Sequence, residues 1–180
     1  MVTKSQHDAL LIELKESKAK QQHLTELLQL VQDIICSHKN SMSIDDVICT
    51  TLKRLFAKFP NYRVSYSTVS KSGVLKVEES FSPSTMVDIK GVSADLTVAS
   101  EYLAKLRSDK PIIINNVYTD PMLVCLRDAM KAGNTYAVLD VPLSHDDDLV
   151  GLICLDANQE CAWSEEEVEV VKEVASVLEV

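Results

Sequence analysis

The chain has 180 residues, of which 46% are hydrophobic and 25% are charged, and its formal net charge at pH 7 is -9. This size and composition predict one globular domain with an appendage. The negative charge argues against nucleic acid or an anionic membrane surface as a partner, and no apolar run approaches the roughly 20 residues that span a bilayer. The five cysteines are scattered without a CxxC pair. This pattern indicates neither a disulfide framework nor a metal site, and it favours a reducing cytoplasm.

The first 40 residues contain no Pro or Gly and predict one long helix from about residue 5 to residue 38. Residues on one side of this helix recur at alternating spacings of four and three, as in the seam of a coiled coil. The seam comprises Leu10, Leu14, Ser17, Gln21, Leu24, Leu28, Val31 and Ile35. We interpret residues 1–23 as a coiled-coil extension and residues 24–180 as the domain, with the seam joining two copies of the chain. A helix that packs only on its own domain is the alternative.

The next segment predicts a helix followed by a β-hairpin. Ser43 is placed to cap the helix, and Pro60 ends it. Residues 62–69 and 74–81 have the length and alternation of paired strands, and Gly73 lies in the turn between them.

The middle of the chain predicts three shorter elements. Ser93 is a candidate cap for a helix that continues to about Arg107. Residues 112–115 form a short apolar strand, and residues 122–131 form a short helix that Gly133 stops.

Two strongly apolar runs dominate the C-terminal third. Residues 137–143 and 149–156 flank a short polar break and predict a hairpin. Since both runs are almost continuously apolar, we expect this hairpin to be covered on both faces, at the centre of a sheet. Ser164 and Glu167 have the spacing of a capping box and predict the start of the last helix.

This order of elements is typical of an α+β fold with a mainly antiparallel sheet. Several stretches resemble the GAF family of sensory domains. They are residues 110–117 (KPIIINNV), 120–121 (DP), 137–143 (AVLDVPL), 149–156 (LVGLICLD) and 163–167 (WSEEE). The resemblance extends from residue 24 to residue 178. It implies a central sheet with helices on both faces, the first and last helices on one face, and a ligand pocket on the other.

The resemblance also implies a function. GAF domains usually dimerise through their terminal helices and regulate a histidine kinase, a cyclic-dinucleotide enzyme or a transcription regulator. We therefore expect a non-catalytic, cytoplasmic regulatory domain that binds a small molecule and acts in signal transduction as a homodimer. The expected interface includes Val171 and Leu178 of the last helix, together with the seam residues Leu10, Leu14, Leu24, Leu28, Val31 and Ile35.

Six residues are candidates for the ligand pocket, because such pockets are mostly apolar with a few well-placed polar groups. They are Tyr66, Tyr102, Cys125, Arg127, Tyr136 and Asp140. Asp140 interrupts an apolar strand, and a buried carboxylate needs partners. Two interpretations of Asp140 stay open, a polar contact in the pocket and a structural acceptor at a helix end.

No cofactor is identified by these residues. The Asn-Lys…Phe…Asp-Glu signature of GAF domains that bind cyclic nucleotides is absent. Cys125 resembles the cysteine that links the chromophore in bilin-binding GAF domains, but Leu126 follows it where those domains usually have His. A small buried hydrophobic residue is the alternative interpretation of Cys125.

Two other functions remain open. One is a dimerisation and relay module whose pocket is filled by its own side chains. The other is a free methionine sulfoxide reductase, since such enzymes also resemble GAF domains and use cysteine pairs, for which Cys125, Cys154 and Cys161 are available. The acidic stretch at residues 145–148 predicts a solvated hairpin tip and not a cation site, because it lacks the ligand spacing of an EF-hand.

Overall fold

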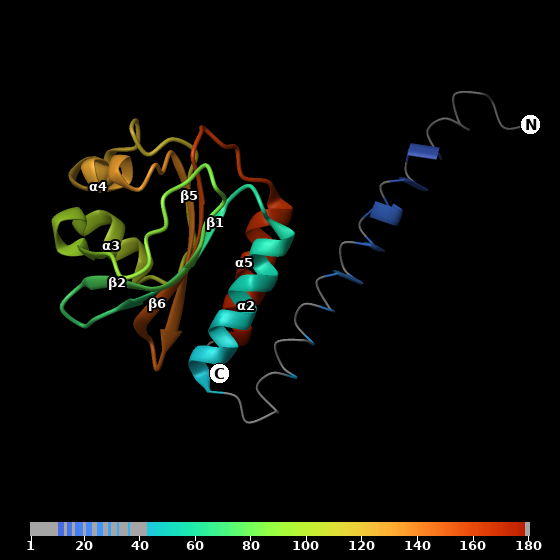
Figure 1. The fold of residues 1–180 in the computed structure, drawn as a ribbon, viewed down its shortest axis with the longest axis horizontal. Coiled ribbons are helices and arrows are strands. Elements are labelled where there is room, and N and C mark those ends of the chain that lie inside the picture. Colours follow the sequence, from blue (N-terminus) through green and yellow to red (C-terminus); the bar gives the residue numbers. More distant parts are fainter. Residues whose placement is uncertain are drawn as a thin grey trace, which may run out of the picture.

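The computed structural model describes residues 43–178 continuously, and residues 11, 12, 14, 15, 17–19, 21, 22, 25, 26, 29, 32 and 36 individually. Its centre is a six-stranded sheet with the strand order β3-β2-β1-β6-β5-β4, in which every pair is antiparallel. Helices cover both faces of the sheet (Figure 1). The predicted α+β class is confirmed. Both strands of the second hairpin lie inside the sheet, with β6 at its centre and β5 next to the short edge strand β4.

The structure gives the following bounds for the elements. The strands are β1 (Arg63–Val69), β2 (Val74–Phe81), β3 (Ser93–Asp95), β4 (Ile112–Ile114), β5 (Ala137–His145) and β6 (Asp148–Ala157). The helices are α2 (Ile44–Lys58), α3 (Ser100–Leu106), α4 (Arg127–Ala132) and α5 (Glu165–Leu178), with two 3-10 helices, η1 (Leu96–Ala99) and η2 (Pro121–Leu126). Both predicted hairpins, β1–β2 and β5–β6, are therefore present.

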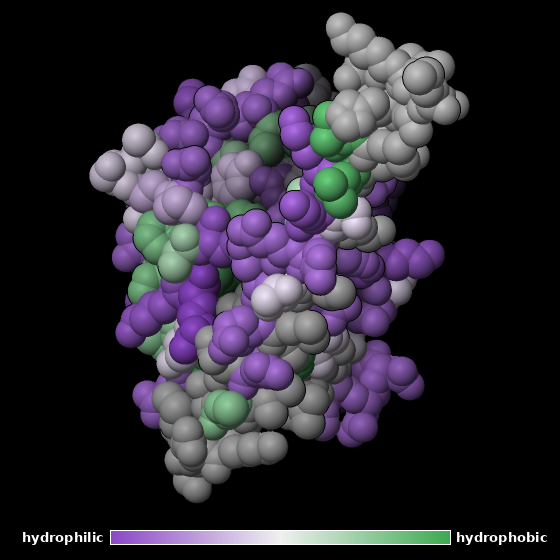
Figure 2. All heavy atoms as spheres, turned by 90° about the vertical axis from the view of Figure 1, so that its right-hand side faces the viewer, coloured by the Kyte–Doolittle hydropathy of each residue, from purple (hydrophilic) through white to green (hydrophobic). Residues whose placement is uncertain are grey.

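Two helices far apart in the sequence, α2 and α5, lie together on one face of the sheet (Figure 1). Alternate strand residues, including Val64 and Leu155, point toward them and are fully buried with Leu52 of α2 and Val170 of α5. This follows from the period of two in a strand, which sends successive side chains to opposite faces. The outer surface on this side is mostly hydrophilic where it is described (Figure 2).

The opposite face is covered by α3, α4 and the 3-10 helices (Figure 1). Leu103 and Leu106 of α3 and Leu123 of η2 pack there against Val138 and Leu152 of the central hairpin. The central strands β5 and β6 are thus buried on both sides, as their continuous apolar sequences predicted.

Two of the three predicted helix caps, at Ser43 and Ser164, are confirmed. The Ser43 side chain accepts a hydrogen bond of 3.2 Å from the backbone N–H of Asp46. At the start of α5, Glu167 Oε2 accepts from the backbone N–H of Ser164 at 2.7 Å, and Ser164 Oγ accepts from that of Glu167 at 3.2 Å, which completes the capping box. The hairpin tip is exposed, and Asp146 and Asp147 adopt the positive φ angles of a two-residue turn.

One predicted helix begins later than expected. Residues 93–95 form the edge strand β3, which pairs with β2, so Ser93 is not a helix cap. Instead Asp95 accepts a hydrogen bond of 2.9 Å from the backbone N–H of Thr97 and starts η1. The helix expected at residues 122–131 is likewise divided, into η2 and α4.

The described residues between positions 11 and 36 are all helical and exposed, as expected for the first helix. Leu14 is 52% exposed, and Lys58 of α2 donates a hydrogen bond of 3.4 Å to Glu26. The remaining predicted interface residues of this segment lie outside the described residues, namely Leu10, Leu24, Leu28, Val31 and Ile35.

The two interface candidates of α5 lie against their own domain. Val171 is fully buried in the core of its own domain. Its side chain is therefore not available to a second chain, in contrast to its predicted place in the dimer interface. Leu178 is partly buried against the same core. Within the described residues, no helix combines the length and apolarity needed to span a membrane.

Candidate functional site

A cavity of about 120 Å³ lies between the sheet and the layer formed by α3 and α4. Its apolar wall includes Val77, Val92, Met130, Val138 and Leu152. Its polar wall comprises Arg63, Ser65, Ser67, Tyr102, Thr135, Asp140, Cys154 and Asp156. An apolar cavity with a few convergent polar groups is the usual form of a small-molecule site.

The strand register brings most of the polar wall together. Cys154 of β6 lies opposite Asp140 of β5 and Ser65 of β1, so these three residues form one row across the sheet. Arg63 lies opposite Asp156 in the next row toward the α4 end of the cavity. Since side chains alternate along each strand, the positions between them point to the α2 and α5 face.

Arg63 is only 1% exposed and is the centre of a hydrogen-bond network. Its Nε and Nη2 donate to Asp156 Oδ2 at 2.9 and 2.6 Å. Its Nη1 donates to the carbonyl oxygens of Val87 at 2.9 Å and Gly133 at 2.7 Å, and Nη2 also donates to Thr135 Oγ1. A guanidinium group has five N–H donors, and these contacts use all of them.

Asp140 has a different environment, because its partners are neutral. The Tyr102 hydroxyl donates to Asp140 Oδ2 at 2.6 Å, and the Cys154 thiol is a second donor to the same carboxyl. Burial raises the pKa of Asp140 to about 7, the charge of Asp156 adds to this rise, and the two hydrogen bonds oppose it. The Asp140 carboxyl therefore changes charge near neutral pH.

The remaining acid and thiol of the cavity are also shifted by burial. Burial raises the pKa of Asp156, and its ion pair with Arg63 opposes that rise. Burial raises the pKa of the Cys154 thiol well above its ordinary value, and the charge of Asp140 adds to the effect. Because the thiolate is the reactive form, Cys154 is not activated for thiol chemistry.

Of the six residues predicted for the pocket, Tyr102 and Asp140 line this cavity. Tyr66 points to the opposite face, where it packs against the core beneath α2. Tyr136 is half-buried and stacks edge to face on Tyr118, with ring centres 5.0 Å apart.

The other two candidates, Arg127 and Cys125, are near η2. Arg127 Nη2 donates to the Asp120 carbonyl oxygen at 3.4 Å, while its buried Nε has no hydrogen-bond partner within the described structure. Cys125 is exposed, so its alternative interpretation as a small buried hydrophobic residue is wrong. Neither residue lines the cavity.

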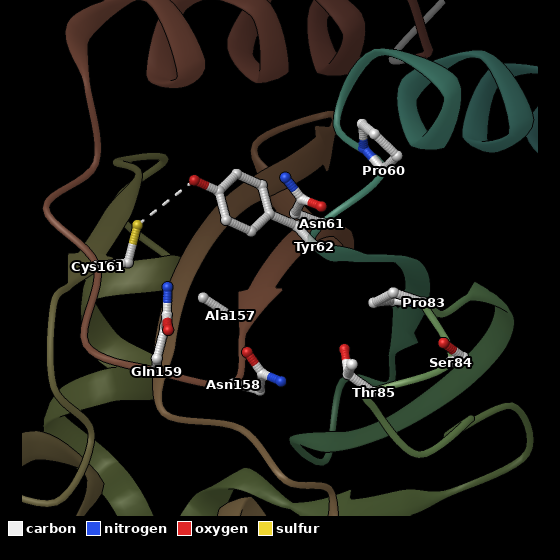
Figure 3. A pocket seen from close by; sticks show the side chains of 10 residues that line it. All are labelled: Pro60, Asn61, Tyr62, Pro83, Ser84, Thr85, Ala157, Asn158, Gln159 and Cys161. Atoms are coloured by element: carbon white, nitrogen blue, oxygen red, sulfur yellow. Dashed lines mark hydrogen bonds between the residues drawn. The ribbon is translucent and has the colours of Figure 1, made fainter.

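A second, larger cleft of about 690 Å³ lies beyond one end of the sheet (Figure 3). It is lined by neutral side chains, including Asn61, Asn158 and Cys161. The hydroxyl of Tyr62 points toward Cys161 Sγ at 3.6 Å (Figure 3). The same hydroxyl donates to Glu167 Oε1 at 2.8 Å. Burial raises the pKa of Tyr62 well above its ordinary value, so its hydroxyl stays protonated at neutral pH.

The three cysteines considered for thiol chemistry have different surroundings. Cys154 lines the first cavity, Cys161 lines the second, and Cys125 is on the surface. All are free thiols. Within the part of the chain that the structure describes, no group of three or more His, Cys, Asp or Glu residues is arranged to hold a metal ion.

The sequence did not predict six of the polar residues of the wall as pocket residues, namely Arg63, Ser65, Ser67, Thr135, Cys154 and Asp156. A signal was present, since the first three occupy alternate positions of one predicted strand and therefore share one face. A polar strand face normally contacts solvent, and only the covering layer of α3 and α4 makes this one part of a cavity.

Comparison with known proteins agrees with this architecture. The family model of the GAF domain matches residues 43–180. The phycocyanobilin-bound GAF domain of a cyanobacterial phytochrome superposes with a TM-score of 0.76 at 17% identity, over 85% of this chain and 91% of that chain. No curated protein matches the chain.

Two further solved structures are similar. The blue-light absorbing form of the Thermosynechococcus elongatus PixJ GAF domain gives a TM-score of 0.66 at 17% identity, over 76% of this chain and 84% of that chain. The chromophore-binding domain of a bacteriophytochrome from R. palustris gives 0.72 at 11% identity, over 87% of this chain and 60% of that chain. These identities show a shared fold, and the family match covers most of the sequence. The chain therefore belongs to the GAF domain family.

Proposed function

We propose that this chain is a non-catalytic sensory GAF domain that binds a small molecule in the cavity between the sheet and the α3–α4 layer. The observation that carries this proposal is the buried Asp140 carboxyl on the cavity wall, held by Tyr102. Burying a carboxyl group costs free energy unless it is paired, and a ligand in the cavity would give Asp140 a further partner.

The proposed signal passes from the cavity to the terminal helices. Asp140 and its neighbours on β5 alternate between the cavity and the core beneath α5, and β5 packs directly against α5. A ligand that shifts β5 would therefore bias the packing of α5, as a two-state switch requires. We propose that α5 and a coiled-coil extension at residues 1–23 form a homodimer and pass the change to a kinase, a cyclic-dinucleotide enzyme or a transcription regulator in the cytoplasm.

The ligand proposed for this cavity is not a bilin, although several similar structures contain one. Pockets for ligands of drug size have volumes of about 300–1,000 Å³, whereas this cavity has about 120 Å³. Cys125, at the position that resembles a chromophore-linking cysteine, is exposed and does not line the cavity. A ligand much smaller than a tetrapyrrole fits these two observations.

The small volume also favours a second candidate function, a dimerisation and relay module without a ligand. In that case the hydrogen-bond network of Arg63, Asp156 and Thr135 would only stabilise the fold and would not contact a ligand. Signals would then enter through the helices alone.

Native mass spectrometry of the chain purified from its own host separates these two functions. Under gentle conditions, a sensor is expected to retain extra mass, and Asp140→Asn is expected to lower the retained fraction. The exposed Asp128→Asn is the matched control, because it removes a carboxylate from α4 without changing the cavity wall. If the chain has bare polypeptide mass and no small molecule from a host extract stabilises it against heat, the relay module replaces the sensor.

A further inference from the structure

We infer that the cavity selects a small organic cation with N–H donors, such as a short alkylammonium, and rejects carboxylates and phosphates. This inference rests on the proposed sensory function and adds the charge and size of the ligand. It follows from how the charged groups of the wall are already paired, from the acceptors that remain, and from the volume of the cavity.

Anions lack a binding group in this cavity. Arg63 is the only lining residue with a permanent positive charge. Its N–H donors are all directed to Asp156, Thr135 and the carbonyl oxygens of Val87 and Gly133. An anionic ligand would have to break these bonds and would leave buried acceptors unpaired, which is strongly unfavourable.

Cations, in contrast, meet a carboxylate without a charged partner. The wall has two acidic groups, Asp140 and Asp156, and one guanidinium, Arg63, which pairs with Asp156. When Asp140 is ionised, its donors Tyr102 and Cys154 are both neutral. An ammonium group beside Asp140 would supply the missing charge and donate charge-assisted hydrogen bonds.

The rest of the wall matches the other parts of such a ligand. Ser65 and Ser67 place hydroxyl oxygens on the same sheet face and offer further acceptors. Val138 and Leu152 form an apolar surface for a short alkyl body. An engineered apolar cavity of about 150 Å³ holds benzene, so the 120 Å³ found here suits a ligand of a few carbon atoms.

The experiment titrates the full chain with three probes of similar size and different charge, butylammonium, butanol and butyrate. Calorimetry measures affinity, and amide chemical shifts of β5 and β6 show whether a probe enters the cavity. We expect butylammonium to bind with a dissociation constant in the millimolar range or tighter near pH 8, and butanol and butyrate to bind at least tenfold more weakly. Since Asp140 titrates with a pKa of about 7, the affinity should fall about tenfold between pH 8 and pH 6.

Asp140→Asn should remove both the preference for the cation and its pH dependence, while Asp128→Asn should retain them. If Asp140→Asn does not fold, the pH dependence of the parent chain tests the same point. Butanol or butyrate shifting the cavity amides more strongly than butylammonium would overturn the inference and leave the sensory function in place. Failure of all three probes, with no mass retained from the host, would overturn both.

Discussion

The hydroxyl of Tyr102 donates a hydrogen bond of 2.6 Å to Oδ2 of Asp140, and this bond joins α3 to β5 through the wall of the cavity. Both side chains are almost fully buried, at 4% exposure each. Because a buried carboxylate depends on its donors, Tyr102 links the position of α3 to the charge of Asp140. A ligand that changes this charge would thus act on both layers of the domain.

Tyr102→Phe removes this donor while preserving the ring. We expect a loss of about 1–3 kcal/mol in the free energy of unfolding near pH 8, where Asp140 is largely ionised. The loss should be smaller near pH 6, because a protonated carboxyl needs the donor less. Urea unfolding at the two pH values measures this difference. Tyr118→Phe is the control, since the described structure shows no hydrogen bond from that hydroxyl, and equal losses at both pH values would contradict the prediction.

The charge of Asp140 should make the fold less stable as the pH rises. Burial raises the pKa of Asp140 in the folded state to about 7, whereas an unfolded Asp has a pKa of about 3.9. The folded chain therefore holds a proton that the unfolded chain releases, and this stabilisation is complete below about pH 4 and disappears as the pH rises through 7.

Asp140→Asn removes this contribution and should flatten the pH profile of the free energy of unfolding. Relative to the variant, the parent chain should lose about 2.5 kcal/mol between pH 5 and pH 7.5. Comparing the two curves cancels the titrating groups that do not interact with Asp140. Parallel curves would mean that Asp140 titrates in its usual acidic range.

The sequence predicted the order of the elements and the central hairpin because those features depend on local pattern. Each of these features can be read from the residues of the element itself. Examples are the continuous apolar runs of β5 and β6, the Ser43 cap and the Ser164–Glu167 capping box. The strand β3 cannot be read in this way. Its three residues have no period to detect, and they form a strand only because the edge of β2 is available for pairing.

The candidate site was predictable only in part, for a related reason. Asp140 was recognisable because a carboxyl group in an apolar run requires an explanation, and Tyr102 has the spacing of an inward helix face. The pairing of Arg63 with Asp156 has no such signal, since it depends on the register between β1 and β6, which are 93 residues apart at this pair. Long-range register is a property of the folded sheet and not of either strand alone.

The Arg63–Asp156 pair should be costly to break on one side and much less costly to replace. Arg63→Met leaves the buried Asp156 carboxylate without its partner and should lower the free energy of unfolding by about 3–5 kcal/mol. The double variant Arg63→Met with Asp156→Leu should recover much of this loss, because no charge remains buried. Urea unfolding of the single and double variants measures the coupling.

A surface ion pair provides the control for the variants of the buried pair. Lys71 and Asp148 are 2.9 Å apart, but their side chains are 91% and 61% exposed. Lys71→Met should therefore have little effect on stability, since solvent screens such pairs. If the double variant of the buried pair is as unstable as Arg63→Met alone, the arginine contributes through its bonds to Val87, Gly133 and Thr135 more than through its charge.

The heptad seam of the first helix predicts a homodimer that one substitution can dissociate. Leu28 occupies a seam position, and Leu28→Asp would place a charge where a partner helix should pack, at a cost of several kcal/mol. Ala19→Asp makes the same change of charge on the far side of the helix, where the structure shows an exposed position. Light scattering should give twice the mass of the chain for the parent and for Ala19→Asp, and the mass of one chain for Leu28→Asp. A monomeric parent would refute the interpretation of the seam as a dimer interface. Loss of the dimer in both variants would mean that the added negative charge, and not its place in the seam, dissociates the two chains.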